Sequence, residues 1–255
     1  SGKPNLNFFR SLLWKLSNKN IQNVFCNTHE QKKELIEKGI FSANKIQVLN
    51  DPVFILKNVL NERNEENFDK KFVKNNILLV GRLTRQKNFE LIIKAFKDLK
   101  EKELQNYKIF IIGDGEQKNK LNQLIINSKL EKNIFLLGQK KNVNKYYFNS
   151  KIFIMSSLWE DPGFVLIEAA VNNCFIISSD CKSGPNEILE DGKGGLLFRN
   201  DDIESLKKKI REYLILKNED MKKMKINVKK NIKKYSLIQH YKLLTKLIYD
   251  QEKLI

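Results

Sequence analysis

The sequence predicts an α/β protein built on a doubly wound parallel sheet. Short apolar segments that suit strands alternate with amphipathic segments that suit helices, from residue 77 to residue 198. Strands that alternate with helices pair in parallel, because each helical connection returns the chain to the same end of the sheet. The 255 residues can form one large domain or two smaller ones.

Six strands are expected in this main domain, each short and rich in aliphatic residues or phenylalanine. They are placed at residues 77–81, 109–113, 134–138, 152–156, 175–179 and 195–198. Helical periodicity fills the connections, for example at residues 90–100 and 118–128. After the last strand, Asp201 and Asp202 are expected to cap a helix that continues through Leu214.

The first 60 residues form a separate and smaller unit. An amphipathic helix, a strand, a helix and a second strand are expected, in this order, at residues 6–16, 21–26, 29–37 and 45–49. A single β-α-β fragment is too small to bury its own sheet. We therefore expect the chain to be a fragment of a longer protein that supplies the rest of this unit.

Composition places the domain boundary in a polar connector that is rich in Asn and Glu. The expected organisation is a partial first domain at 1–60, a linker at 61–74, the main domain at 75–235 and a C-terminal helix at 236–255. We expect this last helix to pack back across the domains. Its apolar positions, expected in a core or at a domain interface, are Leu237, Tyr241, Leu244 and Ile248.

The formal net charge of +17 raises the question of an anionic partner. Most of the basic residues are lysines scattered among asparagines, without an arginine-rich tract, zinc-finger spacing or an aromatic RNA-binding motif. This pattern fits a solvated basic surface or a face that rests on anionic lipid. Nucleic acid is not the expected partner, but a basic module that binds nucleic acid or a membrane remains the alternative.

The main candidate site follows the fourth strand of the main domain. There a loop that contains Pro162 and Gly163 leads into a helix that begins at Phe164. A helix start at the carboxyl end of a parallel strand offers free N–H groups and a positive dipole end to an anion. Glu160 and Glu168 lie on either side of this helix start, and an ionised carboxylate accepts hydrogen bonds from sugar hydroxyls.

Two cations follow the first strand of the main domain. Gly81 and Arg82 end that strand, and Lys87 lies in the same loop. Glycine lets a phosphate approach the backbone, and two cations balance its charge. The carboxyl ends of parallel strands share one edge of a sheet, so we expect these residues and Glu160 on the same side. The combination favours a diphosphate ligand.

Two further turns lie at the same edge. Gly113 begins a Gly-Asp-Gly turn that lacks the third glycine of a dinucleotide fingerprint, because Lys118 occupies its position. We expect this turn to line a nucleotide pocket, and an NAD site is not favoured. Residues 183–187 form either a plain turn or a second ligand contact. No P-loop, Gly-x-Ser-x-Gly elbow or Asp-x-Asp pair is present in the sequence.

Together these motifs resemble the retaining GT-B glycosyltransferases of family 4, also called glycosyltransferase group 1. The similar pieces are ILLVGRLTRQKN at 77–88, IIGDGE at 111–116, SLWEDPGFVLIEA at 157–169 and SSDCKSGPNEIL at 178–189. Glu160 and Glu168 keep the family's E-x7-E spacing. The resemblance extends over residues 76–199, and residues 5–54 resemble the last β-α units of the family's N-terminal acceptor domain.

The resemblance implies a role for each candidate residue. Arg82 and Lys87 would hold the donor diphosphate, Glu168 would accept from the ribose hydroxyls, and Glu160 would orient or polarise the transferred sugar. These four are the implied catalytic residues. Gln139 and Lys140 would lie beside the base. The other implied donor contacts are Gly81, Gly113, Gly163, Phe164 and Val165.

The resemblance also implies a GT-B fold with a donor domain and a partial Rossmann-like acceptor domain. The enzyme would move a sugar, with a UDP-sugar as the expected donor, to a glycan or lipid-linked acceptor with retention of configuration. We expect no cofactor and no metal, a cytoplasmic location that extends to the inner membrane face, and a role in surface-polysaccharide or lipopolysaccharide synthesis. A sugar-nucleotide epimerase or a phosphorylase on the same fold is the alternative enzyme.

Two departures from the family pattern matter. The usual E-G-F-G sequence is E-D-P-G-F here, beginning at Glu160, which leaves the donor sugar open. The acceptor domain is largely missing from this chain. We therefore expect the chain to bind nucleotide but to turn over poorly by itself.

Overall fold

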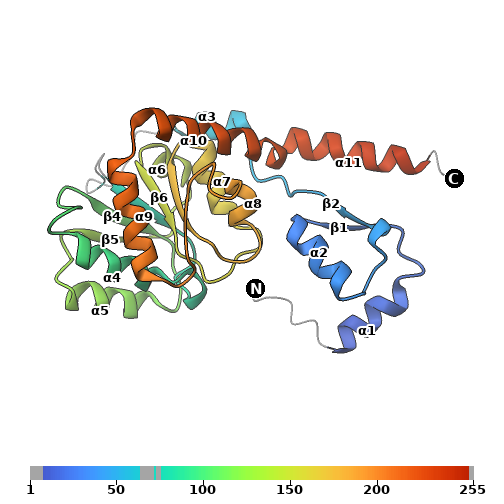
Figure 1. The fold of residues 1–255 in the computed structure, drawn as a ribbon, viewed down its shortest axis with the longest axis horizontal. Helices are drawn as coiled ribbons and strands as arrows, with labels where there is room; N and C mark the ends of the chain where they lie inside the picture. The colour runs from blue at the N-terminus through green and yellow to red at the C-terminus, as the bar shows by residue number, and fades with distance from the viewer. Residues whose placement is uncertain (1–7, 64–71, 73–75, 253–255) are drawn as a thin grey trace.

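The computed structural model describes residues 8–63, 72 and 76–252, which form two lobes of unequal size (Figure 1). Within these residues the larger lobe contains a six-stranded sheet and the smaller lobe a two-stranded sheet. Every neighbouring pair of strands is parallel. The α/β class expected from the sequence is therefore confirmed.

The larger sheet has the strand order β5-β4-β3-β6-β7-β8. Its strands are β3 (Asn76–Val80), β4 (Lys108–Ile112), β5 (Ile134–Gly138), β6 (Ile152–Met155), β7 (Phe175–Ser179) and β8 (Leu196–Phe198). The chain winds outward from β3 to one edge, returns to the middle at β6 and winds outward to the other edge. The strand order therefore reverses between β3 and β6, which is where open α/β sheets bind ligands.

Helices cover both faces of this sheet. The helices of the larger lobe are α4 (Phe89–Leu99), α5 (Lys118–Asn127), α6 (Asn144–Phe148), α7 (Phe164–Val171), α8 (Pro185–Leu189), α9 (Ile203–Ile215) and α10 (Asn218–Asn231). Side chains alternate along each strand, so Ile77 and Leu79 face the core beneath α4, α5 and α9. Leu78 faces a second core that is closed by α6, α7 and α10.

The smaller lobe consists of β1 (Val24–Cys26), β2 (Ile46–Val48), α1 (Phe8–Ser17), α2 (His29–Glu37) and a 3-10 turn at Ala43–Lys45. Its core is small, with Cys26, Ile40, Phe41 and Ile46 as the buried members. Thr28 starts α2, since its hydroxyl accepts a hydrogen bond from the Gln31 amide at 3.1 Å.

Two chain segments connect the lobes and bond to each other. The outgoing segment leads to α3 (Leu56–Arg63), which packs on α6, and the returning segment passes through a 3-10 turn at Ile232–Tyr235. The Val53 amide donates to the Tyr235 carbonyl at 2.8 Å, and the Leu237 amide donates to the Phe54 carbonyl at 3.1 Å. The crossing is therefore a short parallel pairing rather than a loose tether.

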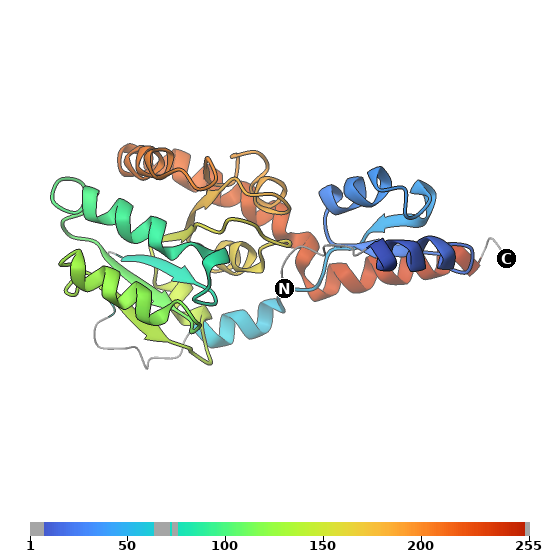
Figure 2. The same ribbon diagram turned by 90° about the horizontal axis from the view of Figure 1, so that it is seen from below.

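The last helix, α11 (Leu237–Glu252), runs in the half of the molecule that holds the smaller lobe (Figures 1 and 2). The His240 Nδ1 atom lies 2.8 Å from the Asn50 carbonyl oxygen, which links the helix to the end of β2. Its expected apolar stripe is not buried in this structure, because Tyr241 is 68% exposed and Ile248 51% exposed. The small two-stranded lobe offers these side chains too little apolar surface to cover them.

Three short helices depart from the sequence-based expectation. Residues 61–63, expected at the start of the linker, form the last turn of α3. Residues 64–71 and 73–75 of the expected linker lie outside the described part. Phe72 packs within 4.7 Å of Phe110, ring centre to ring centre. The helices α6 and α8 are five residues each. Segments this short lack a full helical period of apolar residues, so the pattern did not reveal them.

Candidate donor site at the carboxyl edge of the sheet

The loops that follow β3 and β6 are bonded directly to each other. The Leu158 amide donates to the Gln86 carbonyl at 2.8 Å, and the Gln86 side-chain amide donates to the Trp159 carbonyl at 2.8 Å. The Ser156 hydroxyl, fully buried, donates to the Lys87 carbonyl at 2.8 Å. These bonds fix the two loops at the position where the strand order reverses.

A buried ion pair lies between these loops. The Lys87 Nζ atom is 2.6 Å from Glu160 Oε1, and the side chains are 12% and 7% exposed. A charge pair this far from water is retained only with close geometry, because desolvation of both groups is costly. The sequence placed the two residues on one edge of the sheet, and the structure brings them into contact.

The turn after β4 packs against the loop after β3. The Gly81 amide donates to the Ile112 carbonyl at 3.0 Å, and the Gly113 amide donates to the Gly138 carbonyl at 3.0 Å. A Cβ atom on Gly113 would lie 1.9 Å from the Gly81 carbonyl oxygen, and the Gly113 φ angle is +145°. Only glycine fits there, so the contact between the loops explains this residue without a ligand.

The start of α7 provides backbone donors beside the ion pair. Gly163 precedes the helix with φ of +93°, and no side chain in the described structure caps this end. The first N–H groups of a helix have no partner within the helix. Those of Phe164 and Val165 are thus available at a positive dipole end. Phe164 is 38% exposed, so the helix start is accessible.

Glu168 lies just over one turn inside α7 and is mostly buried. Its Oε2 atom accepts a hydrogen bond from the hydroxyl of Tyr147 at 2.9 Å. Burial raises the pKa of the Glu168 carboxyl, and the Tyr147 hydrogen bond and the positive charge of Lys87 oppose that rise. Glu168 and Glu160 thus have different partners, although both belong to one loop–helix segment.

The remaining predicted residues lie around this centre. Arg82 is exposed in the loop after β3, and Gln139 and Lys140 follow β5 directly, with Gln139 exposed. The Gly113 and Gly138 backbones connect the ends of β4 and β5, as described above, so the predicted residues share one edge of the sheet. Tyr147 was not predicted from the sequence. It lies 21 positions before Glu168, and no local sequence pattern indicates which helix contacts Glu168.

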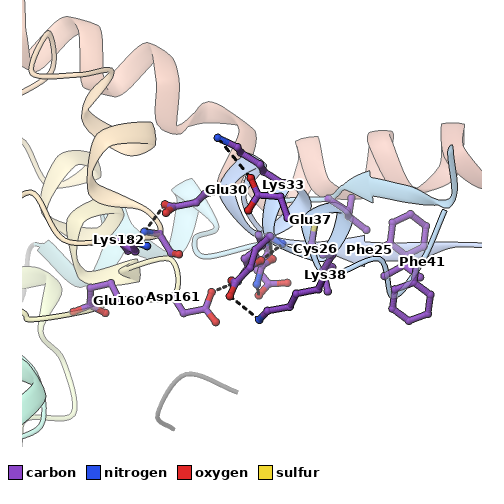
Figure 3. Close-up of a pocket in the computed structure, with 18 of the residues that line it drawn as sticks. Phe25, Cys26, Glu30, Lys33, Glu37, Lys38, Phe41, Glu160, Asp161 and Lys182 are labelled. Carbon is purple, nitrogen blue, oxygen red and sulfur yellow. Dashed lines mark hydrogen bonds and ion pairs between the residues drawn. The ribbon is translucent and has the colours of Figure 1, made fainter. Parts of the chain in front are cut away.

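A cavity of about 1100 Å³ extends from this edge into the gap between the lobes (Figure 3). Glu160 and Asp161 border it from the larger lobe, and Phe25 and Phe41 border it from the smaller lobe. Burial raises the pKa of Asp161, and the carboxylates of Glu34, Asp51 and Glu160 raise it further. The cavity is therefore an acidic and partly aromatic space within a basic chain.

Hydrogen bonds also join the lobes, some at the wall of this cavity and one beside it. The His29 amide at the start of α2 donates to Glu187 Oε2 at 3.0 Å, and the Ser183 amide donates to Glu30 Oε2 at 2.6 Å. The segment at 183–187 therefore contacts the other lobe, and this gives it a structural role. The side chain of Gln31 also bonds to Asp161.

Residues 61–231, more than half of the chain, match the family described as Glycosyl transferases group 1. The chain belongs to this family. An uncharacterized glycosyltransferase of Methanocaldococcus jannaschii is 40% identical over 170 residues, which cover 65% of this chain and 41% of that protein. This group 1 chain spans about half, or less, of the length of the curated relatives that it matches.

Two further comparisons agree with this membership. A relative from Campylobacter jejuni is 32% identical over 191 residues, 74% of this chain and 52% of its own length. It is named GalNAc-alpha-(1->4)-GalNAc-alpha-(1->3)-diNAcBac-PP-undecaprenol alpha-1,4-N-acetyl-D-galactosaminyltransferase. The crystal structure of Anabaena HepE in complex with UDP has a TM-score of 0.78 at 16% identity, over 98% of this chain and 70% of that one. The GT-B fold is thereby shown.

Among the described residues, no group of three or more His, Cys, Asp or Glu side chains is arranged to hold a metal ion. No helix in the described ranges combines the length and the apolar character that crossing a bilayer requires.

Proposed function

We propose that this group 1 glycosyltransferase chain binds a nucleotide-diphosphate sugar, with UDP as the nucleotide, and belongs to a retaining, family 4 enzyme. The observation that carries the proposal is the buried Lys87–Glu160 pair at the start of α7, with Glu168 just over one turn further along. This arrangement places a cation, free backbone donors and two carboxylates at the edge where α/β sheets bind nucleotides.

The diphosphate is assigned to Arg82, Lys87 and the start of α7. A helix N-terminus without a side-chain cap favours anions through its free N–H groups and its dipole. Arg82 is exposed in the adjacent loop and supplies a forked donor that suits phosphate oxygens. Because these donors can balance the leaving diphosphate, the proposed reaction uses no divalent metal and no cofactor.

The nucleoside and the sugar are assigned to the two glutamates. Glu168 accepts from the ribose hydroxyls, since a carboxylate offers only acceptors, and the base lies beside the backbone of Gln139 and Lys140. Glu160 orients the transferred sugar, and its ion pair with Lys87 holds it in one position. The placement of a UDP-bound protein, Anabaena HepE, among the structural neighbours supports uridine as the base.

The proposed chemistry retains the anomeric configuration. The bond between the anomeric carbon and the diphosphate oxygen breaks, its electron pair leaves with the diphosphate, and Lys87 and Arg82 stabilise the charge. The acceptor hydroxyl then attacks from the same face, and its proton passes to a diphosphate oxygen. No protein nucleophile takes part, so Glu160 and Lys87 act through position and charge.

The acceptor is assigned to the cavity between the lobes. Carboxylates accept hydrogen bonds from sugar hydroxyls, and the exposed aromatic ring of Phe25 offers a face for stacking. The name of the Campylobacter relative includes a polyprenyl-diphosphate glycan, which supports a glycan or lipid-linked acceptor here and a role in surface polysaccharide synthesis. We place the enzyme in the cytoplasm, with its basic surface against the inner membrane face.

Calorimetric titration with UDP, GDP and ADP, with and without EDTA, tests this proposal. We expect saturable binding of UDP that EDTA does not change. Arg82→Ala should weaken it by about 10-fold or more, the usual loss for a hydrogen bond to a charged group. Arg211→Ala, an exposed arginine on α9 that bonds to Glu103, is the matched control and should have no effect. Absence of binding, sensitivity to EDTA, or equal effects of both variants would overturn the proposal.

A further inference from the structure

Tyr147 is a buried tyrosine whose hydroxyl bonds to a residue of the donor site. It is 1% exposed, and its hydroxyl donates to Glu168 Oε2 at 2.9 Å. The two residues are 21 positions apart, on α6 and α7. The bond is therefore a tertiary contact across the core beneath the site and does not follow from local helix geometry.

Packing holds the tyrosine ring in place from two sides. The ring meets that of Phe153 on β6 edge to face, with 5.4 Å between the ring centres. The Cys174 thiol donates to the Tyr147 carbonyl at 2.9 Å, which fixes the backbone of α6 below the ring. A ring held in this way cannot move its hydroxyl away from Glu168 without opening the core.

Because of this hydrogen bond, the two oxygens of the Glu168 carboxylate have different partners. Oε2 of Glu168 is occupied by Tyr147, so Oε1 is left for another donor. The charged or titratable groups that face Glu168 are Tyr147 from α6 and Lys87 from the loop after β3, with the Cys174 thiol next to Tyr147. A tyrosine hydroxyl bonds more strongly to an ionised carboxylate than to a neutral one.

We propose that Tyr147 is a positioning residue, which fixes the Glu168 carboxylate with one oxygen turned toward the ribose hydroxyls of the donor. This inference rests on the donor role proposed above for Glu168. Tyr147 itself touches neither sugar nor diphosphate, because its side chain is buried beneath α7. It acts by holding Glu168 in one rotamer and in its ionised form.

Tyr235 is a second buried tyrosine in the same core, and in the described part of the chain its hydroxyl fills space without a hydrogen bond. Tyr235 is 0% exposed, and its hydroxyl has no hydrogen-bond partner among the described residues. Tyr235→Phe is thus the matched control for Tyr147→Phe. Both changes remove one buried hydroxyl, but only Tyr147→Phe removes a bond to Glu168.

The test measures UDP affinity by calorimetry between pH 5 and pH 8 for the native chain and both variants. We expect Tyr147→Phe to weaken UDP binding by about 3- to 10-fold at pH 7, the usual loss for one hydrogen bond. We also expect the loss of UDP affinity at acid pH to begin at a higher pH in this variant, because burial raises the pKa of Glu168 and the Tyr147 hydrogen bond opposes that rise. Tyr235→Phe should reproduce the native profile. An unchanged profile for Tyr147→Phe, or the same change in both variants, would overturn the inference.

A measurement without nucleotide separates this inference from the proposed function. Carbon NMR of the native chain, with labelled Glu carboxyl and Tyr ζ carbons, follows the titration of Glu168, whose signal is identified by its loss in Glu168→Gln. We expect the Tyr147 signal to follow the Glu168 titration, and absence of this coupling would contradict the inference even if UDP binds. If Tyr and Glu signals are coupled but Glu168→Gln leaves UDP affinity unchanged, the donor role fails instead, and the inference fails with it.

Discussion

The two lobes differ in how they hold their functional surfaces. In the larger lobe, a core on each face of the sheet supports the loops that carry Lys87 and Glu160, and hydrogen bonds join these loops to each other. In the smaller lobe, two short strands support the cavity wall, and Phe25 is 43% exposed. The proposed donor site is therefore supported by the core of its own lobe, whereas the proposed acceptor side takes much of its position from contacts with the larger lobe.

This difference agrees with a division of labour between the lobes. Positions that must stabilise a developing charge gain from fixed geometry, because no reorganisation is then needed during the reaction. A surface that admits a large acceptor gains from being open. Two hydrogen bonds across the gap, from the Ser183 amide to Glu30 and from the His29 amide to Glu187, join the two lobes beside these surfaces.

The largest expected effect comes from glycines, one in each lobe. In Gly113→Ala the new methyl group would lie 1.9 Å from the Gly81 carbonyl oxygen, so the site loops must separate. We expect a loss of more than about 5 kcal/mol in unfolding free energy, in the range of the rare severe single substitutions. In Gly39→Ala nothing lies within 4 Å, and only the φ of +57° is strained. We expect a loss of about 1–2 kcal/mol there.

Urea unfolding followed by circular dichroism measures both glycine variants against the native chain. Equal losses would contradict the claim that close packing of loops at the donor site sets the requirement for Gly113.

The next largest effect concerns the buried ion pair. Lys87→Met leaves Glu160, 7% exposed, without its cation, so we expect a loss of about 3–5 kcal/mol in unfolding free energy. Lys207 is 11% exposed, but its partners Asp98 and Glu204 are 49% and 71% exposed. Water can compensate those partners, so Lys207→Met should cost much less. Unfolding in urea at pH 7 checks the pair, and similar losses would contradict the proposed burial of the site charges.

A smaller effect is expected from Glu168, with a definite dependence on pH. Its folded-state pKa is raised above the ordinary 4.5, so the fold binds its proton more tightly than the unfolded chain does. Ionisation of Glu168 therefore costs stability; the cost is absent below pH 4.5 and grows as pH rises through the folded pKa. We expect Glu168→Gln to raise the urea midpoint at pH 7 and not at pH 4. A lower midpoint at pH 7 would show that ionised Glu168 stabilises the fold.

The smallest effect is expected at the contact between the lobes. Glu187→Gln weakens the bond to the His29 amide at the start of α2, where a carboxylate contributes about 0.3–1 kcal/mol. We expect faster hydrogen exchange in α2 and unchanged exchange in β3 and β6. Mass spectrometry of deuterated peptides makes the comparison. Faster exchange in β6 would mean that the contact also stabilises the larger lobe.

The sequence predicted the parts that depend on local pattern. Each strand of the larger sheet begins within one residue of its expected start, because runs such as Ile134–Gly138 are apolar on both faces. Placement of Lys87 and Glu160 at one edge followed from the rule that parallel strands end together. Their direct contact did not follow, since it depends on how two loops fold against each other.

The parts that were missed depend on tertiary contacts. The partner of Glu168 could be predicted to exist, since a carboxylate among apolar neighbours needs one, but Tyr147 lies on a helix too short to recognise. The exposed apolar stripe of α11 shows that a pattern can be recognised while its burial cannot be predicted. A periodic pattern such as Tyr241 and Ile248 indicates an apolar helix face, but not whether the described chain contains enough surface to cover it.

The edge of the sheet between β3 and β6 is proposed to bind a nucleotide diphosphate. Two-dimensional amide NMR of the chain during titration with UDP tests it most directly, because each residue reports separately. We expect shift changes at residues 81–88, 139–140 and 157–168 that saturate with UDP, and no changes in α10. Shift changes spread over the lysine-rich surface of α10, with none in those three segments, would contradict this proposal and favour a basic surface that binds anions without a donor site.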